Sequence, residues 1–68
     1  MKVGDLVKVW NSAWARARTA YVIGTIVENF YYIEPDDKDR TGHYFWPVLV
    51  NGKSDDIDER RLEVLDAR

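Results

Sequence analysis

The longest run of β-prone residues in the chain is YVIGTIVENFYYI, residues 21–33. Nearly every residue in this run is β-branched or aromatic, and such residues favour a pleated strand over a helix. Both faces of the run are apolar in places, which predicts a strand that bends across two parts of a sheet. Gly24 lies inside the run. An isolated glycine in a strand predicts a bulge or a close approach of another backbone, as at the corner of a barrel.

A shorter strand is predicted before this run, in residues 3–10. Val7 and Val9 alternate there with Lys8 and an aromatic neighbour, after a Gly-Asp turn signal. Residues 11–20 then break the alternation and contain four alanines, which have little strand propensity. A short helix over residues 12–18 is one interpretation, but ten residues between two strands rarely hold a stable helix. We therefore expect an irregular loop.

The second half of the chain begins with a loop, residues 34–42, which contains proline, three aspartates and a closing glycine. The segment HYFWPVLV, residues 43–50, is the second strong strand. Pro47 places that strand at an edge or a bend, because proline lacks a backbone donor for the sheet. Asn51 and Gly52 follow directly, and this pair predicts a type I′ hairpin turn.

An acidic segment, residues 55–59, follows the predicted turn and carries Ile57 as its one apolar residue. Paired carboxylates can perform acid–base catalysis, but that requires a cleft that shifts their pKa values apart. We expect instead a solvated loop around a buried Ile57. Residues 62–65 form a last short predicted strand.

Four or five short strands in 68 residues leave few architectures. A flat sheet of these strands would leave an apolar face uncovered, so the strands must curl on themselves. The sequence thus predicts one all-β domain over residues 1–68, a small, partly open barrel of four to five antiparallel strands. The candidate core comprises one or two of the tryptophans and the apolar strand positions Val7, Val9, Val22, Ile26, Val48, Val50, Ile57, Leu62 and Val64.

Composition limits the function classes. Ten lysines and arginines stand against twelve acidic residues, a formal net charge of −2, which argues against a polyanion binder driven by overall charge. The chain has no cysteine, so neither a thiolate nucleophile nor a disulfide is available. No classical secretion signal and no apolar run of membrane-spanning length are present in the sequence. We therefore expect a cytoplasmic protein with no membrane partner.

Several segments together resemble a known barrel family. They are GDLVKV (residues 4–9), GTIV (24–27), WPVLVNG (46–52), Ile57 and LEVL (62–65). Their order resembles that of small SH3-like barrels of the Tudor and KOW type, over the whole chain. More narrowly, it resembles the short, uncharacterised SH3-like proteins of tailed phages, especially those of marine cyanobacteria. The resemblance implies an accessory or virion protein that acts in the host cytoplasm or in the virion. The KOW glycine turn and the Tudor aromatic cage have no match here, so no binding residue is transferred.

No enzymatic or metal-binding motif is complete. His43 is the chain's one histidine, and zinc needs three or four ligands. Ser12 and Ser54 lack the flanking motif of a catalytic serine. Residues 37–42 imitate the first half of a calcium loop, but Val48 stands where the closing glutamate is required. The sequence therefore predicts no enzyme, no cofactor and no metal.

The aromatic residues carry the leading functional hypothesis. A barrel this small cannot bury all nine aromatic side chains, and the triplets FYY and YFW must point to both faces of their strands. Exposed tyrosine and tryptophan are typical of recognition surfaces. We expect a non-enzymatic interaction module that binds a protein partner, or a second copy of itself, through an aromatic face formed by loop 11–20 and the strand residues near Trp46. The candidate residues are Trp14, Arg16, Arg18, Tyr32, Tyr44 and Trp46.

An alternative is a nucleic-acid-binding barrel. The segment WARAR contains Trp14, Arg16 and Arg18, and this combination suits base stacking beside phosphate contacts. Two arginines form a small phosphate footprint next to two acidic segments. We therefore rank nucleic acid below a protein partner.

Overall fold

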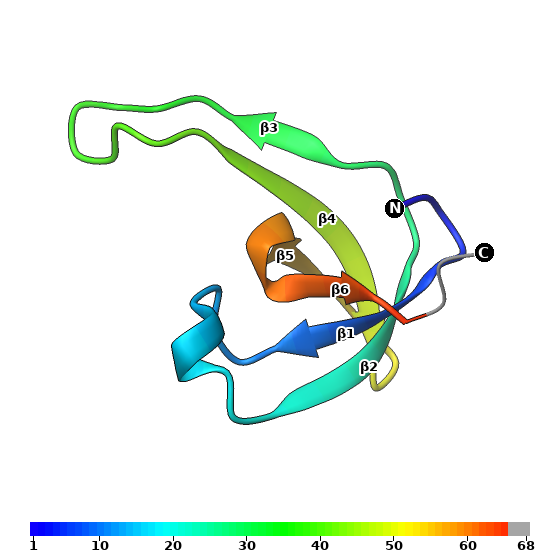
Figure 1. Ribbon diagram of the computed structural model, residues 1–68. Helices are drawn as coiled ribbons and strands as arrows, with labels where there is room; N and C mark the ends of the chain where they lie inside the picture. Colours follow the sequence, from blue (N-terminus) through cyan, green and yellow to red (C-terminus); the bar gives the residue numbers. More distant parts are fainter. Residues whose placement is uncertain (66–68) are drawn as a thin grey trace.

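The computed structural model describes residues 1–65 and is all-β (Figure 1). Its antiparallel strands curl into a small, partly open SH3-like barrel, which confirms the predicted fold class. The strands and two 3₁₀ turns follow in the order β1 (Leu6–Trp10), η1 (Ala15–Ala17), β2 (Tyr21–Ile26), β3 (Tyr31–Ile33), β4 (His43–Val50), β5 (Lys53–Asp58), η2 (Glu59–Arg61) and β6 (Leu62–Val64). Among residues 1–65, no helix has the length and apolar character needed to cross a membrane.

Strand β4 organises the sheet because it pairs with three other strands. Its Phe45 lies opposite Tyr31 of β3 on one edge and opposite Asp58 of β5 on the other. Further along β4, Val48 pairs with Ile26 of β2. Strand β2 also pairs with β1, which pairs with β6. The barrel therefore runs β5-β4-β2-β1-β6 with β3 as an extension, and in the described chain no pairing closes it between β5 and β6.

The core lies inside this curl, where alternate side chains of each strand point. Its buried residues are Val7, Val9, Ile26, Trp46, Val48, Ile57 and Leu62, with Val50 and Val64 packed against them. The predicted core is confirmed except at Val22, whose side chain is 47% exposed. Val22 pairs with Val9 on the inner side of the sheet, but β4 meets β2 only from Thr25 onward. The prediction for Val22 is wrong because no strand of the described chain covers the start of β2.

Two residues predicted to mark special backbone positions do so. A Cβ atom at Gly24 would lie 2.5 Å from Val48 Cγ1 and 3.1 Å from the Leu49 carbonyl oxygen, so β2 and β4 approach each other there as only glycine allows. Pro47 lies where β4 changes its partner from β3 to β2, and its carbonyl accepts a hydrogen bond from Val27 N at 3.1 Å. The predicted bend of the sheet is thus built from both residues.

The turns and loops also follow the sequence closely. Asn51 has φ 51° and Gly52 has φ 78°, the two positive angles that a type I′ turn requires. Loop 11–20 is irregular except for the single turn η1, and a hydrogen bond of 3.1 Å from Asn11 N to Ala20 O closes its base.

Two segments differ from the prediction. Residues 21–33 form two strands rather than one, because residues 27–30 leave the sheet between β2 and β3. The acidic segment after the turn is not a solvated loop but most of β5, paired with β4 from Lys53 to Asp58. The hairpin register decides this second case, since it directs Ile57 into the core opposite Trp46 while the exposed Asp56 lies opposite Pro47.

Candidate functional site

A row of aromatic rings covers the inner side of the hairpin formed by β3 and β4. The ring of Phe30 lies 5.2 Å from that of Trp46 and 5.4 Å from that of Tyr44, and Tyr44 lies 4.8 Å from Tyr32. The register places Tyr32 directly opposite Tyr44, so both point to the side of the sheet that carries Trp46. We call Phe30, Tyr32 and Tyr44 the aromatic row.

The aromatic row is exposed although it continues the core side of the sheet. Phe30 is 43% exposed, Tyr32 is 47% exposed and Tyr44 is 45% exposed. The pairing of β4 with β5 ends at Phe45, so beyond this point β4 has only β3 beside it among the described residues. Figure 1 shows this part of the hairpin extending away from the barrel. The row is therefore an apolar face that no other element of the described chain covers.

Trp46 is at the buried end of the row and does not belong to the exposed face. Its side chain is 5% exposed, and its indole Nε1 donates a hydrogen bond of 2.8 Å to Glu59 Oε2 of η2. The prediction that Trp46 contributes to a binding face is thus corrected, because its place in the core leaves no ring face for a partner. Phe30 takes its place, although the sequence prediction did not include it. Its even spacing from Tyr32 is the signal that could have identified it.

The three predicted residues of loop 11–20 have different surroundings. Trp14 is 78% exposed, and Arg16 is also exposed. Arg18 is partly buried instead: its Nη2 donates to Arg60 O at 2.7 Å, and its guanidinium lies 5.4 Å from the ring centre of Trp10. Arg18 therefore fixes the loop to η2, whereas Trp14 and Arg16 are available to a partner.

Hydrogen bonds join loop 11–20, η2 and the hairpin at one end of the barrel. Arg18 binds the carbonyl of Arg60 in η2, and Arg60 Nη2 lies 2.9 Å from Nδ1 of His43 in β4. In Figure 1 the orange turn η2 lies between loop 11–20, at the lower left, and the hairpin above it. The structure thus brings loop and hairpin to one end, but among residues 1–65 no ring contact joins Trp14 to the aromatic row.

His43 belongs to an ionic cluster that the sequence did not reveal. Its Nε2 contacts Asp39 Oδ2, and its Nδ1 lies 3.5 Å from Asp58 Oδ2 as well as close to Arg60. Arg60 donates two hydrogen bonds to the Asp58 carboxylate, from Nε to Oδ1 at 3.1 Å and from Nη2 to Oδ2 at 2.7 Å. Both ring nitrogens of His43 have partners within this cluster, which holds loop 34–42 against β5. In residues 1–65, no group of three or more potential metal ligands is close enough to hold an ion.

Two carboxylates of this cluster are stabilised in their charged form. Hydrogen bonds from the Arg60 side chain hold the pKa of Asp58 below its usual value, against a smaller opposing effect of burial. The backbone N–H of Thr41, followed by the His43 side chain, lowers the pKa of Asp39. The opposite effect occurs on the outer side of the hairpin, where a hydrogen bond to Asp56 raises the pKa of Tyr31. Charge thus gathers on the outer side, while the aromatic row carries none.

Comparison with protein-family profiles, with curated proteins and with solved structures finds no match to this chain. The resemblance to phage-encoded barrels, with the location that it implies, therefore stays a prediction.

Proposed function

We propose that this protein is a non-enzymatic SH3-like interaction module that binds an extended segment of a protein partner along its aromatic row. One observation carries the proposal: the side of the sheet that forms the core within the barrel continues as three rings between 43% and 47% exposed. Aromatic side chains at such density are typical of recognition surfaces, and tyrosine is among the residues that contribute most to binding. Covering such a face with a partner removes apolar surface from water and so lowers the free energy of the complex.

Contact among the three rings favours a partner segment that covers all of them at once. The ring centre of Tyr44 lies 5.4 Å from that of Phe30 and 4.8 Å from that of Tyr32, so the rings form one continuous aromatic surface. Aromatic-lined grooves bind extended and proline-rich segments in this way. Tyr32 and Tyr44 each combine an apolar ring with a hydroxyl that can bond to a peptide backbone.

A peptide library selected against the immobilised protein tests the proposal. We expect selected peptides to bind the wild-type protein and to lose about tenfold or more in affinity to the double variant Tyr32→Ser, Tyr44→Ser, as for residues at the centre of an interface. Tyr31→Ser is the matched control, because Tyr31 is 40% exposed on the other side of the same strand. Selection of no peptide, or equal losses in all variants, would reject the proposal.

Self-association would use the same aromatic row. Light scattering over a concentration series distinguishes binding of a second copy from binding of a different protein. We expect a monomer whose aromatic row is open to another protein. A dimer that persists in high salt and dissociates in the Tyr32→Ser, Tyr44→Ser variant would identify a second copy as the partner.

Nucleic acid is the alternative because Trp14 and Arg16 are both exposed on loop 11–20. Arg18, the third candidate, is held by Ser12 and Arg60, which reduces the phosphate footprint. The test is fluorescence anisotropy with labelled single-stranded DNA at about 50 mM and about 200 mM salt, where phosphate contacts lose affinity steeply. Tight, salt-sensitive binding that Arg16→Ala abolishes would favour the alternative over a protein partner.

A further inference from the structure

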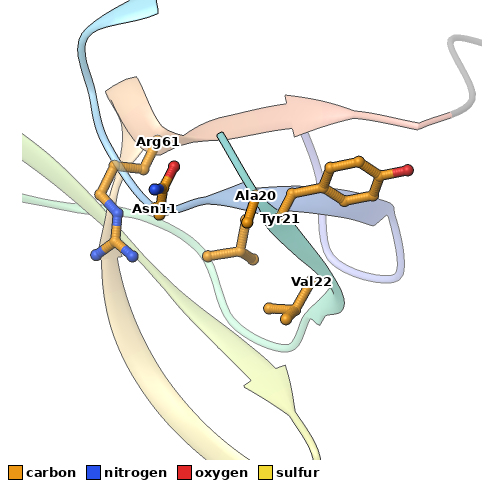
Figure 2. Close-up of a pocket in the computed structure, with 6 residues that line it drawn as sticks. Asn11, Ala20, Tyr21, Val22 and Arg61 are labelled. Atoms are coloured by element: carbon orange, nitrogen blue, oxygen red, sulfur yellow. The ribbon is translucent and has the colours of Figure 1, made fainter. Parts of the chain in front are cut away.

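A small pocket lies at the open end of the barrel, beside the base of loop 11–20 (Figure 2). Its volume is about 240 Å³. Pockets for drug-sized ligands hold about 300–1,000 Å³, so this one suits a group the size of a single amino acid. The lining residues come from β1, the loop base, β2 and η2: Val9, Asn11, Ala20, Tyr21, Val22 and Arg61.

The floor of the pocket is apolar. Val9 is buried, while Ala20 and Val22 are exposed beside it. Val22 is the inward-facing residue that no strand covers, and 47% of its surface is open to solvent. The floor is therefore a piece of barrel interior that an apolar side chain of another molecule can cover.

Arg61 is the one charged residue of the lining. Its Nε donates a hydrogen bond of 2.8 Å to the carbonyl of Trp10, which fixes the guanidinium beside the pocket. Within residues 1–65 no carboxylate lies within 4.0 Å of it, in contrast to Arg60 and its partner Asp58. A partly buried guanidinium without a counter-ion favours a carboxylate, which its terminal nitrogens can bind through two parallel hydrogen bonds.

The walls of the pocket are held in place before any ligand arrives. Asn11 Nδ2 donates to Thr19 Oγ1 at 2.9 Å, and Thr19 N donates to Asn11 Oδ1 at 3.1 Å. In Figure 2 the Arg61 guanidinium lies at one side and the Tyr21 ring at the other, with Ala20 and Val22 between them. A preformed site of this kind spares a ligand the entropy cost of ordering it.

We propose that this pocket binds the carboxyl-terminal residue of a partner polypeptide, with the α-carboxylate on Arg61 and an apolar side chain over Ala20 and Val22. A terminal residue carries both groups on one carbon atom, as a pocket for a single amino acid requires. Capture of a terminal carboxylate is an established mode of peptide recognition. The inference names the chemistry of the partner and so rests on the proposed function, but the pocket shares no residue with the aromatic row.

The direct test is a titration of the ¹⁵N-labelled protein followed by NMR, with three probes. N-acetyl-leucine has both groups, N-acetyl-leucinamide lacks the carboxylate, and acetate lacks the side chain. We expect N-acetyl-leucine to shift the backbone amides of Asn11, Ala20 and Val22, and to bind at least about fivefold more tightly than either other probe. Equal binding of the neutral amide, or shifts that map to another surface, would overturn the inference.

Variants test the two halves of the pocket separately. Arg61→Gln should remove the preference for the acid over the amide, whereas Arg16→Gln, an exposed arginine outside the lining, should retain it. Val22→Asn should weaken all apolar probes, whereas Ile23→Asn should not, because Ile23 is equally exposed at 47% but points to the outer side of β2. If Arg61→Gln fails to fold, comparison of Val22→Asn with Ile23→Asn still tests the site. Equal losses of N-acetyl-leucine affinity in these two variants would reject it.

Failure of this inference and failure of the proposed function are distinguishable. The Tyr32→Ser, Tyr44→Ser variant should bind N-acetyl-leucine like the wild type, because the probe does not reach the aromatic row. Peptides that need the row but bind equally with a free or an amidated carboxyl terminus would reject the pocket alone.

Discussion

The two halves of β4 show how one strand produces both a core and a binding surface. Trp46 and Val48 are 5% and 0% exposed, whereas Tyr44, two residues before Trp46 on the same side of the strand, is 45% exposed. The side chains alternate identically in both halves. What differs is the partner, because β2 lies beside Val48 and β3 alone accompanies β4 beyond Phe45. Burial in this protein is thus set by what lies across the sheet, and apolar character alone does not determine it.

The two tryptophans proposed for the same face give the largest expected contrast. Trp46→Ala should lower the free energy of unfolding by about 3–5 kcal/mol, the usual cost of removing a buried aromatic residue. Trp14→Ala should change it by no more than about 0.5 kcal/mol, since the side chain is 78% exposed. Urea unfolding followed by circular dichroism measures both. Similar losses of unfolding free energy in the two variants would show that Trp14 also packs as a core residue. The assignment of Trp46 to the core and Trp14 to the surface would then be wrong.

Two glycines, Gly24 in the barrel and Gly42 beside the hairpin, give the next largest expected difference between core and surface. Gly24→Ala should cost about 1–3 kcal/mol, because the new methyl group meets Val48 and the Leu49 carbonyl, neither of which can move freely. At Gly42 the added methyl group would overlap the Tyr32 hydroxyl, the far end of an exposed side chain. Gly42→Ala should therefore cost less stability and act mainly by displacing the Tyr32 ring from the aromatic row.

Thermal melts together with titration of a selected peptide check the glycine pair. The expected pattern is a large drop in melting temperature with intact affinity for Gly24→Ala, and the reverse for Gly42→Ala. A Gly42 variant that melts as early as the Gly24 variant would contradict the independence of hairpin and barrel.

The smallest expected effect concerns pH, at the ionic cluster that joins the two regions. The pKa of Asp58 is lower in the folded chain than its ordinary value of 3.8, so its stabilising effect is present above about pH 4 and is lost as the pH falls through the lower folded value. Urea unfolding at pH 7 and pH 3 should show wild-type stability falling in acid. Asp58→Asn should begin lower at pH 7 and fall less.

Asp37→Asn serves as the control for the pH experiment. Asp37 is exposed in the same loop as Asp39 and makes no ion pair with any residue in the range 1–65. Its acid response should equal that of the wild type. If Asp58→Asn also loses as much stability in acid as the wild type, other carboxylates carry the effect.

The sequence predicts most of the fold because local rules and tertiary structure agree there. Alternation in β1 and β4, the turn at Asn51 and Gly52, and the close approach at Gly24 are all visible in the residues themselves. The strand character of β5 is hidden by three aspartates, since only pairing with β4 makes an acidic strand stable. Propensity is overridden there by the hairpin register.

The candidate site is less accessible to sequence reasoning, for a physical reason. Tyr44 and Trp46 have the same parity and similar chemistry, and only the point at which β5 stops separates a surface residue from a core residue. Val22 shows the same effect. It is an apolar residue on the inner side of β2, and no strand of the described chain covers it. The bond from Arg18 to η2 and the cluster around His43 join residues 42 and 17 positions apart, a separation that no local pattern reports.

The acidic character of β5 also governs how separate copies of the protein meet. A strand paired on one side offers its free edge to any other strand, and such edges are where sheets stack into aggregates. In β5 this edge carries Asp55 and Asp56, which form no ion pair within residues 1–65, so two copies that approach edge to edge bring like charges together. The open barrel can therefore leave this edge of β5 unpaired, because the charges along it oppose pairing with a second copy.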